Sequence, residues 1–262
     1  MKSIDLLQKQ DLERIKVLCF DCDGVTVPEG TVIKESGGEL TVKTALLDED
    51  FSEKLELLKT RFFLVFSSGR SLLYLSRMYE RILWDKVALQ AEGGLFTLFK
   101  GKVTQLGDFE ERFLKKSTVI KQKIRQLQAT NSNIIGFEPK QFLVTVHCKE
   151  KDSLIEKIVT ENDPENEYHC LWSGEAYDIG PQKFNKGFGL KDFLEKNGLS
   201  LKNVLAVGND PNDQEMVKWA ELSVTTDPKS VIQGADFISN QIGYQGGVEV
   251  VDKILQLINN GS

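Results

Sequence analysis

The sequence predicts an α/β fold, with a core built on a parallel sheet and a second, α+β domain inserted into that core. Toward both ends of the chain, short apolar runs that stop at polar residues alternate with stretches of helical periodicity. Between them the character changes to polar-rich strands and helices. The 262 residues, 40% of them hydrophobic, are enough for such a core and one insert. We expect the core in residues 1–82 and 183–262 and the insert in residues 83–182.

The first elements of the core follow from local patterns. The apolar run of residues 17–20 halts at Asp21, which predicts a buried strand that ends in carboxylates. In residues 31–44, β-branched residues flank Gly37-Gly38, a pattern typical of a hairpin with a two-residue glycine turn. We expect this hairpin to hang over the strand end. Residues 48–59 carry apolar side chains at helical spacing after an acidic start, which favours a helix.

The remaining core elements repeat this order of strand and helix. A second apolar run, residues 62–66, opens into Ser67, Ser68 and Gly69, so the chain predicts a parallel βαβ unit. Three further segments predict two more βα units. Residues 187–198 form an amphipathic helix that ends at Gly198, and residues 203–216 form a strand, a turn and the start of a helix. Residues 223–228 follow as the last segment.

Polar residues gather at three of the predicted strand ends. Asp21 and Asp23 follow the first strand, Ser67 and Ser68 the second, and the loop GNDPND, residues 208–213, the third. Because ligands of open parallel sheets bind beyond the carboxyl ends of the strands, we expect these segments to form one site. Clustered carboxylates repel one another, which raises their pKa values unless a cation neutralises them. A few oxygen ligands that leave room for water and a phosphate favour Mg²⁺.

A different chemistry overlaps the first of these segments, because Cys19 and Cys22 form a C-x-x-C pair. A redox pair needs its first thiol exposed at a helix N-terminus, which lowers the pKa of that thiol. Cys19 instead lies inside the predicted buried strand, and alternation puts Cys22 opposite it. We therefore expect Cys19 to be a small core hydrophobe. His147 and His169 lie on strand-like segments without metal-ligand spacing, so we expect them to be structural or solvated.

The composition of the chain limits the classes of partner that the protein is expected to bind. A net charge of −6, with Lys and Arg scattered along the chain, gives no electrostatic footprint for nucleic acid or an anionic membrane. The sequence holds neither a signal-peptide-like apolar stretch at its start nor a later run of about 18 apolar residues, which favours a cytoplasmic location. Four cysteines are too sparse for a disulfide framework. We expect a small-molecule partner.

Four segments, taken together and in this order, resemble the haloacid dehalogenase superfamily of phosphotransferases. The pattern D-x-D-G-[VT] is matched by residues 21–25, the apolar strand that ends in a hydroxyl by Ser67, the lysine motif by residues 185–187, and the G-D-x-x-N-D loop by residues 208–213. The branch resembled is that of Cof-type, sucrose-phosphate and trehalose-phosphate phosphatases, and the resemblance covers almost the whole chain. It implies a Rossmann-like parallel-sheet core and makes the insert, residues 83–182, a cap that determines substrate specificity.

The resemblance also implies a reaction, the hydrolysis of a small phosphorylated metabolite, with sugar phosphates as the expected class, by a Mg²⁺-dependent phosphoric monoester hydrolase. Such hydrolysis needs up to about 10²¹-fold acceleration, hence a nucleophile, charge neutralisation and an acid together. Asp21 would attack phosphorus and form an aspartyl-phosphate, and Asp23 would protonate the leaving oxygen and then activate water. The phosphoryl oxygens would be held by Mg²⁺, the Ser67 hydroxyl, and the remaining phosphate-binding residues Ser68, Gly69, Lys186 and Asn212.

The same resemblance implies the metal ligands, and here the sequence departs from the family. Asp21 and Asp23 are expected to contribute, together with the last loop. Where the family usually has aspartate after the glycine of that loop, this chain has Asn209, followed by Asp210. Either Asp210 supplies the anionic ligand through a shifted loop, or Asn209 ligates with less charge. We expect the charge to come from Asp210 or from Asp213, the aspartate that the family uses to orient its ligands and lysine.

Two other classes of function stay open on the sequence. A phosphomutase shares the fold, and a catalytically weak protein that binds a phosphorylated metabolite would explain the departure at Asn209. Several further residues also allow two interpretations. Arg70, beside the serine, is either a phosphate contact or a surface arginine at a helix start. The insert holds three residues that are either sugar contacts or solvated polar residues: Glu138, Lys140 and Gln141.

Overall fold

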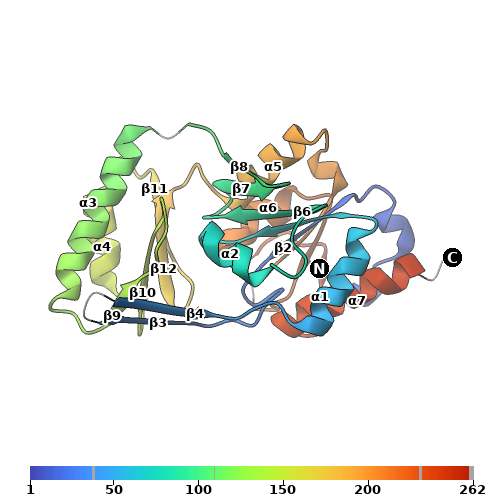
Figure 1. Cartoon of the computed structure of the whole chain (residues 1–262), viewed down its shortest axis with the longest axis horizontal. Coiled ribbons are helices and arrows are strands. Elements are labelled where there is room, and N and C mark those ends of the chain that lie inside the picture. The colour runs from blue at the N-terminus through green and yellow to red at the C-terminus, as the bar shows by residue number, and fades with distance from the viewer. Residues whose placement is uncertain (37–38, 109, 230–231, 260–262) are drawn as a thin grey trace. The chain divides into compact units, whose positions relative to one another are not determined.

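The computed structural model describes residues 1–36, 39–108, 110–229 and 232–259, and the chain divides into two compact units (Figure 1). The core unit comprises Met1–Glu29, Ala45–Leu106 and Asn185–Ser262, and the second unit Gly30–Thr44 and Gly107–Phe184. These bounds differ from the predicted ones: residues 83–106 fold with the core, and the hairpin of residues 31–44 folds with the second unit.

The core unit is built on one sheet. In the described residues nine of its strands pair in the order β1 (Lys2–Ser3), β15 (Phe237–Ile238), β14 (Leu222–Thr225), β13 (Val204–Gly208), β2 (Val17–Asp21), β5 (Phe63–Ser67), β6 (Val87–Ala91), β7 (Phe96–Phe99) and β8 (Lys102–Gln105). In this order, the first seven strands, from β1 at the edge through to β6, pair parallel with their neighbours. Strands β7 and β8 then add to the sheet in antiparallel orientation. The predicted α/β fold with a parallel sheet is confirmed.

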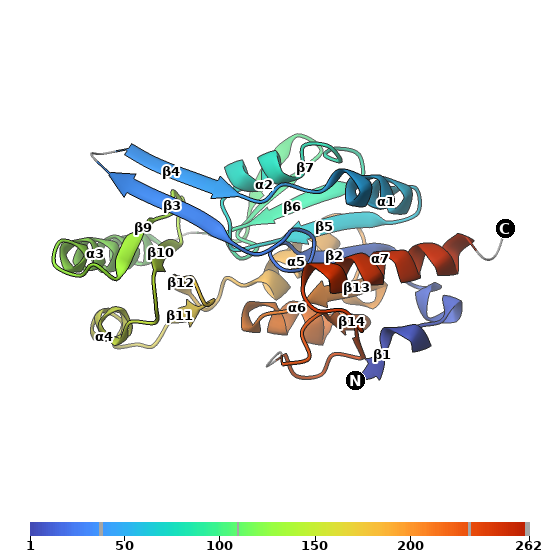
Figure 2. The ribbon, with the colours of Figure 1, turned by 90° about the horizontal axis from the view of Figure 1, so that it is seen from below.

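Both faces of this sheet are covered, which explains why its central strands are apolar throughout. Leu18 and Phe20 of β2 pack toward α1 (Glu49–Lys59), α2 (Leu72–Met78) and α7 (Tyr244–Asn259). Val17 and Cys19 pack on the other face, toward α5 (Lys186–Lys196) and α6 (Gln214–Trp219). Helices α1 and α7 lie side by side (Figures 1 and 2). Short 3₁₀ turns are η1 (Ile4–Leu6), η2 (Lys9–Leu12), η3 (Leu201–Asn203) and η4 (Pro211–Asp213).

Two helices approach the loops beyond the strands so closely that only glycine fits at the contact. A Cβ on Gly189 of α5 would lie 2.5 Å from Cα and O of Gly94, in the loop after β6. A Cβ on Gly247 of α7 would lie 1.8 Å from the carbonyl oxygen of Val25, in the loop after β2. Because backbone atoms oppose both positions, no side-chain rearrangement would relieve the contact. The two glycines therefore fix where α5 and α7 begin relative to the strand ends.

The second unit holds an antiparallel sheet and a hairpin. Its sheet has the order β11 (Tyr168–Trp172), β12 (Ala176–Pro181), β10 (Val144–Cys148) and β9 (Ile134–Phe137). Helices α3 (Glu111–Gln128) and α4 (Ser153–Glu161) pack together against β12 and β11 (Figure 1). Strands β3 (Thr31–Ser36) and β4 (Glu39–Thr44) form the predicted hairpin, visible in Figure 2, while its turn at Gly37-Gly38 lies outside the described residues.

The hairpin belongs to the second unit because of contacts that its strands make there. Ile33 and Glu35 of β3 lie against Gly136 of β9, where a Cβ would be 3.0 Å from Ile33 Cγ2. Glu35 also accepts from Arg125 of α3 at 3.1 Å. Packing and an ion pair therefore tie β3 to the sheet and helix that follow it much later in the sequence.

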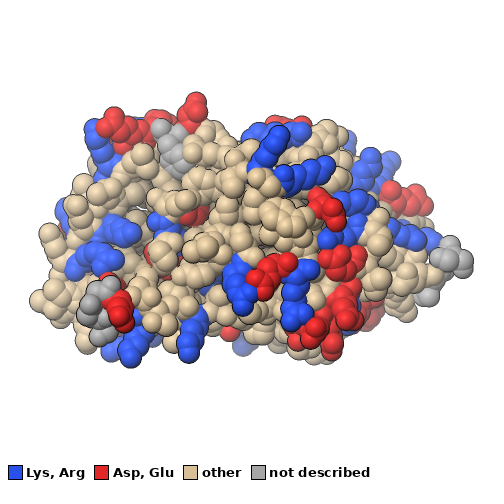
Figure 3. Space-filling view, in the orientation of Figure 1, with Lys and Arg blue, Asp and Glu red and all other residues tan. Residues whose placement is uncertain are grey.

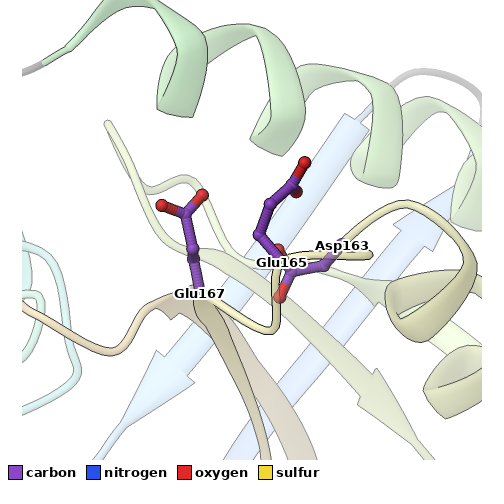
Figure 4. Close-up of side chains that lie close together, drawn as sticks. All are labelled: Asp163, Glu165 and Glu167. Atoms are coloured by element: carbon purple, nitrogen blue, oxygen red, sulfur yellow. The ribbon is translucent and has the colours of Figure 1, made fainter.

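An acidic cluster in the second unit has a structural explanation. Asp163, Glu165 and Glu167 lie close together on the segment that leads into β11 (Figure 4). Lys116 Nζ of α3 contacts all three carboxylates, at 2.6, 3.0 and 3.2 Å respectively. Although burial acts in the opposite direction, Lys116 holds the pKa of Asp163 below its ordinary value. The cluster thus ties α3 to the start of β11.

Charges of both signs are interspersed on the face of the protein that Figure 3 presents. Of the helices in the described ranges, none combines the length and the apolar character that crossing a membrane requires.

Candidate active site

Three adjacent strands of the core unit bring the predicted site segments together. Asp21 at the end of β2 stands in register with Ser67 at the end of β5. On the other side of β2, Phe20 is in register with Val207 of β13, so the loop after Gly208 begins beside Asp21. All three strands are parallel, and their polar ends meet at one edge of the sheet.

Lys186 is the cation at the centre of this edge. It is the first residue of α5, whose N-cap Asn185 accepts from the Phe188 amide at 3.1 Å. Its Nζ lies 2.5 Å from Asp21 Oδ1 and 2.6 Å from Asp213 Oδ1, and its side chain is 2% exposed. Burial alone would lower the pKa of Lys186, but the charges of the two aspartates outweigh it and raise that pKa above its ordinary value. Lys186 is therefore a permanent positive charge.

Asp21 shares this one lysine with a second carboxylate, and one positive charge does not balance two negative ones. Burial, and then the charge of Asp213, raise the pKa of Asp21 well above its ordinary value, although Lys186 opposes the shift. A further cation beside Asp21 would reverse that shift and favour the ionised carboxylate. Asp21 is thus placed where additional positive charge stabilises its reactive form.

Asp213 uses both of its oxygens to organise the loop. While Oδ1 pairs with Lys186, Oδ2 accepts from the backbone amides of Asn209 and Asp210 at 3.0 and 3.1 Å. The residue is fully buried, and a Cβ on Gly208 would lie 2.6 Å from its Cβ. Asn212 Oδ1 lies 3.3 Å from Lys186 Nζ. The arrangement makes Asp213 an orienting group for the loop and the lysine.

Asp23 and Arg70 form a bidentate ion pair. Arg70 donates from Nε to Asp23 Oδ2 at 2.8 Å and from a terminal nitrogen to Oδ1 at 2.6 Å. The Arg70 side chain is only 6% exposed, so the interpretation as a surface arginine is wrong. Its backbone amide also donates to Ser68 Oγ at 3.1 Å, which joins the serine segment to the same pair. The sequence allowed Arg70 to be a phosphate contact but did not predict that Asp23 is its partner.

The serine segment presents one hydroxyl to the site. Ser67 is fully buried, and within the described ranges no hydrogen-bond partner reaches its Oγ. Ser68, which is also buried, donates its backbone amide to Gln90 O at 2.9 Å. Gly69 is half-buried. Ser67 therefore has hydrogen-bonding capacity to spare.

The last loop also carries Asn209 and Asp210, whose side chains bear oxygen. Asn209 is 4% exposed, and its Nδ2 lies 3.4 Å from Glu29 Oε1. Among the residues that the structure describes, none supplies a hydrogen bond to Asn209 Oδ1, which is buried. Burial, and then the charge of Asp213, raise the pKa of the half-buried Asp210 to about 6. Glu29 was not foreseen, and its only sequence signal is a carboxylate a few residues after the D-x-D-G motif.

These residues fit a divalent cation. The carboxylates of the site outnumber Lys186 and Arg70, its two cations: they are Asp21, Asp23, Asp210, Asp213 and Glu29. Two buried oxygens, Ser67 Oγ and Asn209 Oδ1, have no hydrogen-bond partner among the described residues. Unbalanced negative charge together with free oxygen ligands is the setting that Mg²⁺ prefers.

The two thiols of the C-x-x-C pair are structural. Cys19 and Cys22 are both fully buried, as predicted for Cys19. Burial is the largest cause that raises the pKa of each thiol above its ordinary value, and the neighbouring aspartates add to it. Both groups therefore stay protonated, whereas redox and metal-thiolate chemistry requires the thiolate.

In the second unit, two of the three predicted sugar contacts belong to a buried charged cluster. Glu138 Oε1 pairs with His147 Nε2 at 2.8 Å, and Lys140 Nζ lies 3.0 Å from Asp178 Oδ1 and 3.5 Å from Glu138. The Lys140 side chain is 2% exposed, whereas Gln141 is exposed. Glu138 and Lys140 are thus not solvated polar residues. Burial lowers the pKa of His169, the other histidine.

Comparisons with known proteins bear on this arrangement. The family model described as haloacid dehalogenase-like hydrolase matches residues 13–248. A phosphoglycolate phosphatase of Staphylothermus marinus is 32% identical over 111 residues, which are 40% of this chain and 46% of that protein. One of Aeropyrum pernix is 28% identical over 93 residues, which are 35% of this chain and 39% of that protein. The chain spans less than half the length of these curated relatives in the matches.

Solved structures share the fold of the chain. A trehalose-6-phosphate phosphatase related protein aligns with a TM-score of 0.70 and 15% identity, over 94% of this chain and 100% of that one. The C-terminal domain of the trehalose-6-phosphate phosphatase of C. albicans aligns with a TM-score of 0.70 and 17% identity, over 96% of this chain and 95% of that one. At such identities the likeness shows the fold alone.

Proposed function

Since this chain belongs to the family of haloacid dehalogenase-like hydrolases, we propose that it is a Mg²⁺-dependent phosphatase of a small phosphorylated metabolite. The observation that carries the proposal is Lys186, buried between Asp21 and Asp213 at the carboxyl ends of the central strands. Phosphoryl transfer through a covalent intermediate needs a nucleophile, a fixed positive charge and a second carboxylate. In this proposal these groups are Asp21, Lys186 and Asp23.

In the first step, an oxygen of Asp21 attacks phosphorus. With Oδ1 bound to Lys186, Oδ2 is the attacking oxygen in this proposal. The bond from phosphorus to the ester oxygen breaks, and that oxygen takes a proton from Asp23 and leaves as an alcohol. Lys186, the Ser67 hydroxyl and the backbone amide of Gly69 hold the phosphoryl oxygens while their charge redistributes.

In the second step, Asp23 acts as a base. It accepts a proton from a water molecule whose oxygen attacks the aspartyl-phosphate, and inorganic phosphate leaves as Asp21 regains its carboxylate. The contact with Arg70 keeps the Asp23 side chain beside the nucleophile, and it is an ion pair once Asp23 has given up its proton. Asp21 and the oxygen of Asn209 would hold Mg²⁺. When bound, the ion would offset negative charge on Asp21 and on the phosphoryl group.

The substrate class comes from the second unit, which we assign to substrate selection as a cap. Glu138 and Lys140 offer buried charged groups of both signs, which suit the hydroxyl groups of a sugar phosphate. The curated relatives are phosphoglycolate phosphatases, so a phosphorylated hydroxy acid is the second candidate. Assays with both classes separate these candidates.

Asp21→Asn tests the proposal. Released phosphate is measured for wild type and variant with Mg²⁺ on a panel of sugar phosphates and phosphoglycolate, and circular dichroism follows folding. We expect the variant to stay folded and to lose all but a trace of turnover, because the amide is not nucleophilic. Asp50→Asn, on the exposed side of α1, is the matched control and should keep full activity.

The products decide between the classes of function. Retention of more than a few per cent of activity by Asp21→Asn would show that another group is the nucleophile. An isomeric sugar phosphate in place of free phosphate would make the protein a mutase. Binding of phosphorylated compounds with neither product would make it a binding protein.

A further inference from the structure

Glu29 folds back over the D-x-D-G loop of the core unit. Cys22 O accepts from the amides of Thr26 and Val27 at 2.9 and 3.0 Å, and the Gly24 amide donates to Val27 O at 2.8 Å. This tight turn returns the chain toward β13. A Cβ on Gly24, whose φ is +73°, would lie 2.5 Å from both Glu29 Oε1 and Asn209 Nδ2. The glycine thus leaves the space in which the carboxylate and the amide meet.

That contact fixes the orientation of the Asn209 amide. A carboxylate only accepts hydrogen bonds, so the group that faces Glu29 Oε1 at 3.4 Å is the NH₂ of Asn209. The carbonyl oxygen Oδ1 then points away from Glu29. It is buried, and within the described part of the chain no donor reaches it. A buried oxygen in this state has the capacity to bind a further group, such as a cation.

The charges at the loop favour the same role for Glu29. Asn209 is neutral, although the sequence motif leads one to expect an aspartate at this position. Both oxygens of Asp213 are already bound, one to Lys186 and the other to two backbone amides. The carboxyl group of Glu29 lies within a hydrogen bond of Asn209. Its field reaches the loop, since Glu29 is among the groups that raise the pKa of Asp210.

We propose that Glu29 supplies, at the metal site of the proposed function, the negative charge that Asn209 lacks, and fixes Asn209 Oδ1 as a metal ligand. Glu29 is a positioning residue in this scheme, and Asn209 is the ligand. The carboxylate that an aspartate would place in the loop is instead contributed by the segment that follows the nucleophile.

The test measures metal binding without any substrate. Mn²⁺ replaces Mg²⁺ as a paramagnetic probe, free Mn²⁺ is followed by electron paramagnetic resonance, and Mg²⁺ competes for the site. Glu29→Gln keeps the shape but removes the charge, so we expect Mn²⁺ binding weaker by about tenfold, the range found for groups that orient metal ligands. Glu53→Gln, an exposed glutamate on α1, should bind Mn²⁺ as the wild type does.

Exchanging the charge between the two positions gives the sharper result. Asn209→Asp alone would set two carboxylates against one another at the 3.4 Å contact and gain little affinity. In the double variant Glu29→Gln/Asn209→Asp the amide donates and the carboxylate ligates, so Mn²⁺ affinity should return to within about threefold of wild type, a coupling typical of contacting residues. Circular dichroism checks that all variants fold.

Two outcomes overturn the inference. If the wild type binds Mn²⁺ and releases phosphate, but Glu29→Gln binds Mn²⁺ equally well, Glu29 has no role at the metal and the proposed function stands. If the wild type neither binds Mn²⁺ nor releases phosphate from any substrate of the panel, the proposed function fails and this inference fails with it.

Discussion

At the scale of single residues, the pairing of Asp23 with Arg70 stands out because a buried arginine binds both oxygens of the carboxylate. Two parallel hydrogen bonds hold that carboxylate in a fixed plane, a geometry that a lysine does not reproduce. An acid that gives a proton to a leaving group must be held close to that group, so the pair has a direct consequence for the reaction.

Arg70→Met tests that consequence. Without its partner Asp23 is no longer held in place, so proton transfer to a poor leaving group should slow by about 10²-fold, as expected for loss of a positioned acid. Nitrophenolate leaves without a proton and should be affected far less. The measurement is a single-turnover assay of alcohol release from an alkyl phosphate and of nitrophenol release from p-nitrophenyl phosphate. Arg77→Met, with a 60% exposed side chain, is the control. Equal losses on both substrates would contradict the role.

Asp210 makes the stability of the metal-free protein depend on pH. Because its pKa is raised to about 6 in the folded chain, Asp210 binds its proton more tightly there than in the unfolded chain. Its contribution to stability is therefore complete below about pH 4 and is lost as the pH rises to about 6. In Asp210→Asn this titration is absent, so the free energy of unfolding of the variant relative to wild type should rise by about 2 kcal/mol over that interval.

Urea unfolding at a series of pH values, with chelator present, measures this difference. Asp50→Asn should show no such trend. A difference between Asp210→Asn and wild type that stays constant with pH would mean that Asp210 has the same pKa in the folded and unfolded chains.

Asp21, Ser67 and the loop of residues 208–213 were accessible from the sequence because each follows an apolar run, and strand ends meet at one edge of a parallel sheet. Lys186 follows no such run and was predicted only from the family resemblance. The partners of the motif residues were not accessible from the sequence. Glu29 reaches Asn209, and Arg70 reaches Asp23, through turns whose return path depends on backbone hydrogen bonds within the loops. Neither a charge pattern nor a spacing encodes such a path.

At the scale of elements, the position of α5 determines that of Lys186, its first residue. The helix meets the loop after β6 at Gly189, where backbone opposes backbone. An added methyl group at this point must move the helix as a whole, since no side chain is present to give way.

Gly189→Ala separates this contact from helix propensity. Alanine in place of glycine favours a helix by about 1 kcal/mol, but a Cβ 2.5 Å from Gly94 should cost about 1–3 kcal/mol and draw Lys186 away from Asp21. We expect a lower free energy of unfolding in urea and a lower kcat. Lys191→Ala, on the exposed side of the same helix, should change neither by much. A variant more stable than wild type would show that the helix shifts freely.

The order and type of β2, α1, β5, α5 and β13 followed from the sequence, whereas the unit to which some segments belong did not. The polar positions in residues 87–105 led to the prediction that this segment belongs to the insert. In the structure β6 pairs parallel with β5, and β7 and β8 extend the core sheet beyond β6. The hairpin of β3 and β4 was predicted from its β-branched residues, but Gly136 and Arg125 decide where it packs. Such pairings join residues far apart in the chain, and local patterns carry no signal of them.

At the scale of the whole molecule, the two units carry different kinds of buried charge. The core unit concentrates carboxylates around Lys186, whereas in the second unit Lys140 lies between the carboxylates of Glu138 and Asp178. In the proposed division of labour, the first set performs the chemistry and the second selects the substrate.

Lys140→Met tests this division. The loss of a buried ammonium group should lower kcat/KM for the metabolite substrate by about tenfold or more, since unpaired polar groups discriminate strongly. Turnover of p-nitrophenyl phosphate, which has no sugar to recognise, should stay within about twofold of wild type. Lys157→Met, with a 68% exposed side chain in the second unit, is the control, and thermal unfolding monitors stability. Parallel losses on both substrates would assign Lys140 to the fold alone.

The contact between Gly247 of α7 and Val25 bears on how the site is assembled during synthesis. Because translation runs from the N-terminal to the C-terminal side, the loop that carries Asp21 is made before α7, whose backbone packs against it, and before Asn209 and Asp213. Until α7 has been made, the nascent polypeptide therefore contains the D-x-D-G motif without these neighbours. The residues of the candidate site can come together only after α7 has left the ribosome.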